Sequence, residues 1–110
     1  MKLMTNEVRA LLPPLYAQEK LGSQAVVYAR FFTPDSSWTW HALEYDGQDT
    51  FFGLVDGLEK ELGYFSLSEL QSVRGPMGLA VERDLYWKPK TLAEIAPELF
   101  NDVPSEGAMP

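Results

Sequence analysis

The residues of this chain that can carry acid–base or nucleophilic chemistry are few, and they begin with one histidine. His41 is the single histidine among 110 residues, and there is no cysteine. A Ser-His-Asp triad would depend on His41 alone, and a thiolate or His-rich metal site is excluded. Because His41 follows Trp38 and Trp40 in a strand-like run, we expect a packed or half-exposed histidine rather than a catalytic base. A hydrolase built on His41 ranks third among the functions that the sequence permits.

Carboxylate side chains offer a second kind of chemistry, general acid–base catalysis or cation binding. The turn Asp46-Gly47-Gln48-Asp49 holds two carboxylates, but it lacks the ligand series of a calcium-binding hand. Glu59 and Glu61 form another pair, which no pocket-like pattern surrounds. The segment 74–78 places two glycines beside an arginine without the spacing of a phosphate-binding loop. The sequence therefore predicts no catalytic residue, no metal and no cofactor, and it favours a non-enzymatic function.

The sheet that must position these side chains is predicted from three runs rich in Val, Phe, Trp and Tyr, which turn residues separate. Short connections between the runs favour antiparallel pairing. The expected strands are 24–32, 38–45 and 50–55, a fourth through 62–65, and an added short strand at 85–87. The pattern therefore predicts an antiparallel meander of three to five strands.

Three short helices are predicted to border this sheet. Thr5 is a good N-cap for a helix over 6–12, which Pro13-Pro14 ends. Ser66 and Thr91 each stand three residues before a glutamate, the capping-box pattern that opens a helix. We expect helices near the N-terminus, in the middle and near the C-terminus.

Length and composition favour one domain with one core, because 45% of the residues are hydrophobic. The predicted fold class is α+β, with a single domain over residues 1–100 and a disordered tail over 101–110. No apolar run approaches the roughly 18 to 20 residues of a membrane span. No secretory core follows Met1, so a cytoplasmic location without membrane contact is expected.

Alternation along the strands divides their side chains into two faces. One face of the first strand is expected to pack on the helices through Ala25, Val27, Ala29 and Phe31. In the second strand, one side is shared by Trp38, Trp40 and Ala42. Core or cover residues are the expected role of both tryptophans. The alternative is an aromatic patch that remains available to a partner.

Acidic residues dominate one stretch of the chain. The net charge is −7, and the window from Glu44 to Glu69 holds seven acids against one base, Lys60. Between residues 71 and 90 the sign reverses, with four bases against two acids. We expect a bipolar molecule whose acidic sector repels phosphate backbones. A solvated face that aids solubility is the ordinary alternative.

Four segments of the sequence together resemble the bacterial domain-of-unknown-function family numbered 2958. They are LPPLYAQE (12–19), FFTPDSSWTW (31–40), ELGYFSLSEL (61–70) and VERDLY (81–86). The resemblance extends over about residues 1 to 96. It implies a short protein or module carried on plasmids, integrative elements and phages, sometimes within larger proteins thought to protect incoming DNA. It implies no established activity, so it assigns no catalytic residue to this chain.

The leading hypothesis is a non-catalytic interaction module of a mobile genetic element, which binds a host or element protein, with counter-defence as a setting. One candidate surface is acidic and consists of Glu44, Asp46, Asp49, Asp56, Glu59 and Glu61. Phosphate mimicry toward a nucleic-acid-binding enzyme would need these carboxylates in a row at duplex-like spacing. The other candidate surface is aromatic and consists of Trp38, Trp40 and Tyr45. Charge complementarity would chiefly raise association rate and specificity.

The competing hypothesis is a nucleic-acid-associated module. In this hypothesis the sheet aromatics stack on single-stranded bases, while basic residues of the C-terminal half contact the backbone. Those basic residues are Arg74, Arg83, Lys88 and Lys90. Exposed rings beside these cations would favour this function, whereas a helix lying over the rings would count against it.

Overall fold

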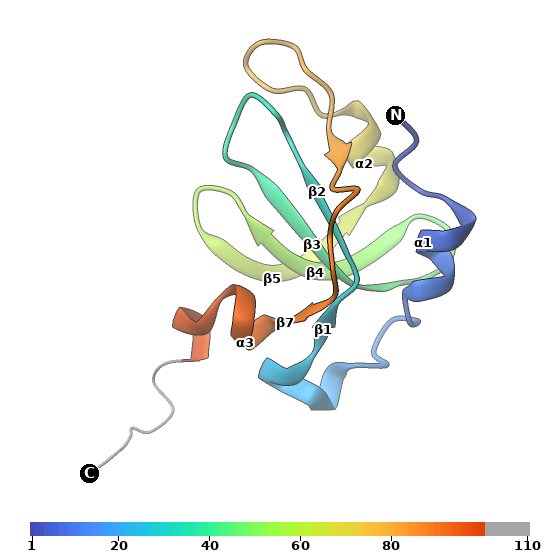
Figure 1. The fold of residues 1–110 in the computed structure, drawn as a ribbon, viewed down its shortest axis with the longest axis vertical. Helices are drawn as coiled ribbons and strands as arrows, with labels where there is room; N and C mark the ends of the chain where they lie inside the picture. The colour runs from blue at the N-terminus through green and yellow to red at the C-terminus, as the bar shows by residue number, and fades with distance from the viewer. Residues whose placement is uncertain (101–110) are drawn as a thin grey trace.

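A five-stranded antiparallel sheet forms the centre of the computed structural model, which describes residues 1–100 (Figure 1). Its strand order is β5-β4-β3-β2-β6. The strands of this sheet are β2 (Ala29–Phe32), β3 (Thr39–Tyr45), β4 (Thr50–Asp56), β5 (Lys60–Ser66) and β6 (Glu82–Arg83). A separate two-stranded ladder pairs β1 (Val26–Val27) with β7 (Lys90–Thr91). The tail predicted over 101–110 lies outside the described residues.

Short helices border the sheet, as the sequence predicted. In residues 1–100 they are α1 (Asn6–Leu11), α2 (Leu67–Ser72), α3 (Leu92–Ile95) and the 3₁₀ helices η1 (Glu19–Gln24) and η2 (Pro97–Phe100). Figure 1 shows α1 and α2 on one side of the molecule and α3 on the other. The predicted α+β class is confirmed.

The helix caps also follow the sequence prediction. The Thr5 hydroxyl accepts a hydrogen bond from the Val8 N–H at 3.1 Å. The capping boxes that begin at Ser66 and Thr91 are both complete. Caps of this kind each contribute on the order of 1 kcal/mol. Local signals therefore determine where all three α-helices of the described chain begin.

Two clusters of buried side chains lie on opposite faces of the sheet. The first includes Phe31, Phe51 and Leu70, and residues of α1 and α2 pack on it. The second includes Leu54 and Leu92, and α3 covers it. Both faces of the central strands are therefore covered, which explains why β3 is buried along its whole length.

The first strand departs from the single face that alternation predicted. Ala25, Val27, Ala29 and Phe31 are all buried, but the first two belong to the second cluster and the last two to the first. The change occurs at Tyr28, between β1 and β2. Because β1 pairs with β7 whereas β2 pairs with β3, one apolar pattern serves two ladders.

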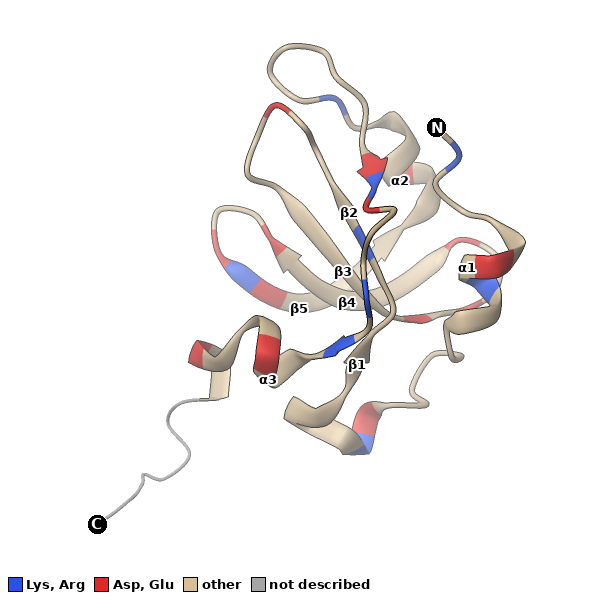
Figure 2. Ribbon diagram, viewed as in Figure 1, with Lys and Arg blue, Asp and Glu red and all other residues tan. Residues whose placement is uncertain are grey.

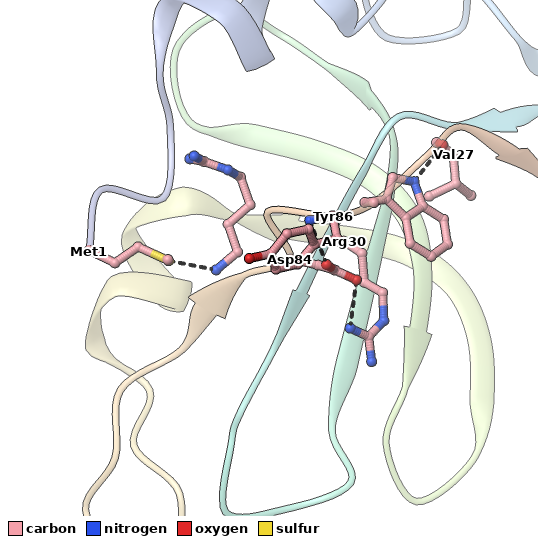
Figure 3. Close-up of polar contacts among 7 residues, drawn as sticks. Met1, Val27, Arg30, Asp84 and Tyr86 are labelled. Atoms are coloured by element: carbon pink, nitrogen blue, oxygen red, sulfur yellow. Dashed lines mark hydrogen bonds and ion pairs between the residues drawn. The ribbon is translucent and has the colours of Figure 1, made fainter.

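The prediction of a strand at 85–87 is wrong, because a turn forms there. The residues that pair with β2 come earlier, in β6. Asp84 fixes this turn. Its carboxylate accepts a hydrogen bond from the Tyr86 N–H at 2.9 Å and forms an ion pair with Arg30 at 3.2 Å (Figure 3). Side-chain bonding of this kind competes with strand pairing, and an apolar run alone gave no sign of it.

A bulge in β3 redirects one acidic side chain. Ala42 pairs with Gly53 and Glu44 pairs with Phe52, so Leu43 is an extra residue in the ladder. As a result Leu43 and Glu44 line the same side of the sheet instead of alternating. The bulge therefore turns the Glu44 carboxylate inward, although the sequence predicted it in an acidic surface.

Candidate functional site

Glu44 is the one predicted surface acid that lies inside the protein. Only 3% of it is exposed. Its two carboxylate oxygens accept hydrogen bonds from the N–H groups of Tyr16 and Gln18, each at 2.8 Å. The Gln18 side chain then donates to the carbonyls of Val26 and Leu43. Glu44 thus anchors the connector that precedes β1, and its assignment to an acidic surface was wrong.

Asp46 and Asp49 bind backbone groups around the β3–β4 turn. The Asp46 carboxylate accepts the N–H groups of Gln48, Asp49 and Thr50 at 2.8, 2.9 and 3.0 Å. These bonds hold the pKa of Asp46 below its usual value, and the bond from Gln48 contributes most. Asp49 accepts the N–H and the hydroxyl of Ser68, both at 2.9 Å, and so caps α2. Turn and cap formation accounts for both carboxylates.

Asp56, Glu59 and Glu61 lie at the other end of β4, in and beside the β4–β5 turn. β4 has seven residues. At the rise of a β-strand it separates the two acidic groups by about 23 Å. Figure 2 shows the acidic positions distributed over separate parts of the molecule. The six carboxylates form no row, so the geometry does not support phosphate mimicry.

The three aromatic candidates divide between core and surface. Trp40 and Tyr45 are buried in the first cluster, whereas 39% of Trp38 is exposed. The ring centroids of Trp38 and Trp40 are 5.9 Å apart. The inner edge of Trp38 therefore rests on the core, and its outer part is left for solvent or a partner. Burial raises the pKa of the Tyr45 hydroxyl, which donates to the Gln48 carbonyl at 2.7 Å.

Two shallow grooves meet at Trp38. One has a volume of about 530 Å³ and is lined by side chains that include Trp38, Trp40, Arg74 and Pro76. The other has a volume of about 310 Å³, and its lining includes Trp38, Leu58, Glu59 and Glu61. Trp38 thus connects the β2–β3 loop, the β4–β5 turn and the loop that follows α2.

Large apolar side chains stand out around these grooves. Leu58 is 93% exposed and Met77, which follows Pro76, is 80% exposed. We define the Trp38 surface as Trp38, Leu58, Pro76 and Met77 together with the neighbouring carboxylates Glu59 and Glu61. The sequence pattern indicated Trp38, Glu59 and Glu61 but not the other three, because an isolated apolar residue in a turn carries no signal of its own.

Asp35 joins the loop 33–38 to the loop 74–80. Its carboxylate accepts a hydrogen bond from the Met77 N–H at 2.7 Å. It also packs on Gly75, where a β-carbon would collide with it. Asp35 therefore positions one side of the Trp38 surface. Sequence reasoning missed this role because the contact joins residues about forty positions apart.

Arg83, one of the four basic candidates, is half-exposed and holds the N-terminus. Its guanidinium donates hydrogen bonds to the carbonyls of Lys2 and Leu3 at 2.7 and 3.0 Å. Its backbone N–H contacts the sulfur of Met1 at 3.0 Å, and Figure 3 shows this contact at Met1. Arg83 therefore fixes β6 to the first residues of the chain, and its assignment to a nucleic-acid surface is not supported.

The other three cations do not gather either. Arg74 lines the larger groove beside Trp38, but its guanidinium also donates to the carbonyls of its own segment. Lys90 lies over the ring of Trp87 at 5.2 Å, and Lys88 is exposed nearby. Only Arg74 of the four basic candidates adjoins an exposed sheet aromatic, so the combined surface required for single-strand binding is not formed.

His41 is buried in β3, and its Nδ1 atom has no hydrogen-bond partner among the described residues. The pKa of His41 is lowered from 6.5 to about 4, mainly because the ring is buried and further because the positive charge of Arg30 is near. Its ring packs against Trp87, with centroids 5.6 Å apart. The sequence predicted a packed or half-exposed histidine, and the structure shows the packed one. His41 lines neither of the grooves at Trp38.

Neither a metal centre nor a membrane-spanning helix occurs within residues 1–100. No group of three or more His, Asp or Glu side chains in that part of the chain could hold a metal ion. No helix there has both the length and the apolar character needed to cross a membrane. The Trp38 surface is the candidate functional site by its exposure and its shape.

Comparisons with known proteins give one match, and it is to a family. No curated protein and no solved structure matches the chain. The model of the family described as Protein of unknown function (DUF2958) matches residues 3–97. The match spans every strand and α-helix of the described fold as well as the Trp38 surface. The chain therefore belongs to the DUF2958 family, as the four sequence segments predicted.

Proposed function

We propose that this chain is a non-catalytic protein-binding module of a mobile genetic element, which binds a host or element protein through the Trp38 surface. The mobile-element setting and a role in counter-defence rest on the family resemblance alone. The binding role rests on one structural observation. Trp38, Leu58 and Met77 expose apolar side chains on three adjoining loops that the fold holds in place.

The chemistry of these side chains suits a protein interface. Trp and Met are enriched where proteins meet, and a central tryptophan often supplies much of the binding energy. The contact of Trp38 with Trp40 orders its ring before any partner arrives. Binding would then cost little side-chain entropy at Trp38, which favours affinity. Single exposed leucines need no explanation, but Leu58 lines one groove at Trp38, and Met77 follows Pro76, which lines the other. We treat these three exposed side chains as one apolar patch.

The charge around the patch limits the kind of partner. Glu59 and Glu61 lie beside Leu58, and both are exposed. A partner with an apolar centre and a basic rim fits this arrangement, because the carboxylates would steer its approach. The same carboxylates repel a phosphate backbone, and Arg74 is the only candidate cation beside Trp38. Protein binding is therefore favoured over nucleic-acid binding.

The experiment is an affinity purification of the tagged protein from host cells that carry the element, with and without nuclease treatment of the lysate. Leu58→Lys and Met77→Lys place a charge in the patch at exposed positions, so the fold should tolerate both. Tyr86→Lys is the matched control, because Tyr86 is 89% exposed on another loop.

The proposal predicts a protein that is retained after nuclease treatment, lost with either patch variant and kept with Tyr86→Lys. Recovery of nucleic acid that nuclease removes, or a protein partner that survives both patch variants, would overturn it. The first of these outcomes would favour the nucleic-acid hypothesis instead.

A further inference from the structure

A small cavity opens on the second face of the sheet, away from the Trp38 surface. Its volume is about 230 Å³. Three aromatic rings contribute to its wall, those of Tyr16, Phe52 and Tyr64, together with the carboxylates of Glu19 and Glu44. No Lys, Arg or His side chain lines it. The cavity thus combines π surfaces with negative charge.

The aromatic rings come from distant parts of the chain and meet at the mouth of the cavity. The rings of Phe52 and Tyr64 pack edge to face with centroids 5.1 Å apart. The hydroxyl oxygens of Tyr64 and Tyr16 are 3.5 Å apart. Both tyrosines are more than half exposed, so a ligand can reach their rings from solvent. Ring faces grouped in this way attract organic cations.

The backbone of Tyr16 is strained, and Glu44 maintains the strain. Tyr16 has a φ of 73°, the left-handed region that a bulky side chain rarely adopts. The Glu44 carboxylate accepts the Tyr16 N–H in that conformation. Strain of this kind often marks a ligand clamp. Here it presents the Tyr16 ring at the mouth of the cavity.

Glu44 has capacity beyond the two hydrogen bonds that it already accepts. A carboxylate offers about four acceptor positions, and two are used by the N–H groups of Tyr16 and Gln18. The bulge in β3 turns Glu44 into the cavity beside Leu43. A donor that enters the cavity would therefore meet an ionisable carboxylate held in fixed geometry.

The size and lining of the cavity point to a single side chain as its occupant. A volume of about 230 Å³ is below the range of roughly 300 to 1,000 Å³ that is typical of small-molecule sites. Leu43, Leu62 and Leu92 contribute apolar lining on which an aliphatic stem can pack. The pKa of Tyr64 is raised, first by its hydrogen bond with Tyr16, then by desolvation, and to a smaller extent by the nearby charges of Glu44 and Glu19.

We propose that this cavity receives a lysine or arginine side chain of a partner protein. The aliphatic stem lies on the leucines, and the charged head lies between the tyrosine rings and Glu44. The identity of the ligand as part of a protein rests on the proposed function. Cation binding by the cavity does not depend on the Trp38 surface, because the cavity and the grooves at Trp38 share no lining residue and can be tested separately.

The experiment is an NMR titration of the full chain with four probes: N-acetyl-lysine-methylamide, its arginine and norleucine counterparts, and n-butylammonium. The norleucine probe keeps the stem and lacks the charge. The proposal predicts saturable shifts of the Leu43, Leu62 and Leu92 methyl groups with the lysine or arginine probe. It also predicts binding weaker by about fivefold for norleucine, since the cation–π and carboxylate contacts are lost.

Two variants locate the effect. Tyr64→Leu removes an exposed ring from the mouth of the cavity and should weaken binding of the cationic probes by about fivefold. Tyr86→Leu removes a still more exposed ring elsewhere and should leave binding unchanged. Because neither side chain is buried, both variants should fold.

Several results would overturn the proposal. One is equal binding of the norleucine probe, which would make the cavity merely apolar. Another is binding of n-butylammonium without either capped cation, which would indicate a free amine as ligand. Absence of saturable shifts, or shifts confined to the exposed acids outside the cavity, would also refute it. If the cavity binds no cationic probe but Leu58→Lys still abolishes partner capture, the cavity proposal fails and the proposed function stands.

Discussion

Replacing Glu44 with glutamine is the sharpest perturbation of the interior. The substitution keeps the size of the side chain but exchanges one acceptor oxygen for an NH₂ group. In the native protein both oxygens accept a backbone N–H, from Tyr16 and from Gln18, at 2.8 Å. In Glu44→Gln one of these N–H groups must face another donor, so it loses its partner in a buried setting.

The expected cost follows from these two bonds. A buried donor left without a partner costs about 1 to 3 kcal/mol. The remaining bond loses its charge assistance, which adds about 1 kcal/mol. We expect a total of about 2 to 4 kcal/mol, a large part of the roughly 5 to 15 kcal/mol that stabilises a typical domain. At about 4 to 8 °C per kcal/mol, the melting temperature should fall by roughly 8 to 32 °C.

Urea unfolding followed by tryptophan fluorescence measures this cost, because a change in midpoint at constant slope reports stability. Glu61→Gln is the matched control. It makes the same chemical change at an exposed carboxylate, and it should alter stability by less than about 0.5 kcal/mol. If Glu44→Gln were as stable as Glu61→Gln, the reasoning that assigns Glu44 to the interior network would be refuted.

Three further predictions concern other buried or capping groups. The folded-state pKa of His41, about 4, lies below its unfolded value of 6.5, so the native state should lose up to about 3 kcal/mol as pH falls from 6.5 to 4. His41→Phe should flatten that dependence in urea titrations at each pH, and a slope equal to wild type would contradict it. Asp49→Ala removes the acceptor of Ser68 and should cost about 1 kcal/mol in the same assay, whereas no loss would show that water replaces the cap. Gly75→Ala should displace the Asp35 carboxylate and raise amide exchange at Met77, and unchanged exchange would mean that the loop adapts.

Local patterns in the sequence were sufficient to predict most of the framework. Thr5, Ser66 and Thr91 mark helix starts through bonds to residues three positions away, which a sequence displays directly. The strands β3, β4 and β5 follow from β-branched and aromatic runs joined by short turns. Both kinds of signal act over a few residues, so tertiary structure did not override them.

The errors arose where distant residues decide the outcome. Glu44 was assigned to the surface because it belongs to a stretch rich in acids, and nothing in the sequence shows that Leu43 is an extra residue in the ladder. The run at 85–87 was read as a strand because its apolar character was visible and the bonds of Asp84 were not. Arg83 looked like a free cation until its carbonyl partners at the N-terminus were known.

The candidate site was predictable only in part, for the same reason. Trp38 is conspicuous in the sequence as a tryptophan beside a turn. Leu58 and Met77 become meaningful only when the fold brings their loops to Trp38. The cavity bounded by Tyr16 and Tyr64 joins positions 48 residues apart, and no local pattern connects them.

Site-specific photo-crosslinking in host cells that carry the element tests the central claim most directly. A photoreactive amino acid would replace Leu58, Met77 or, as the control, Tyr86, three side chains that are each at least 80% exposed. If the Trp38 surface binds a protein, we expect one discrete protein adduct at Leu58 and at Met77, and none at Tyr86. No adduct at either patch position, or the same adduct at all three positions, would contradict the claim that the Trp38 surface binds a protein.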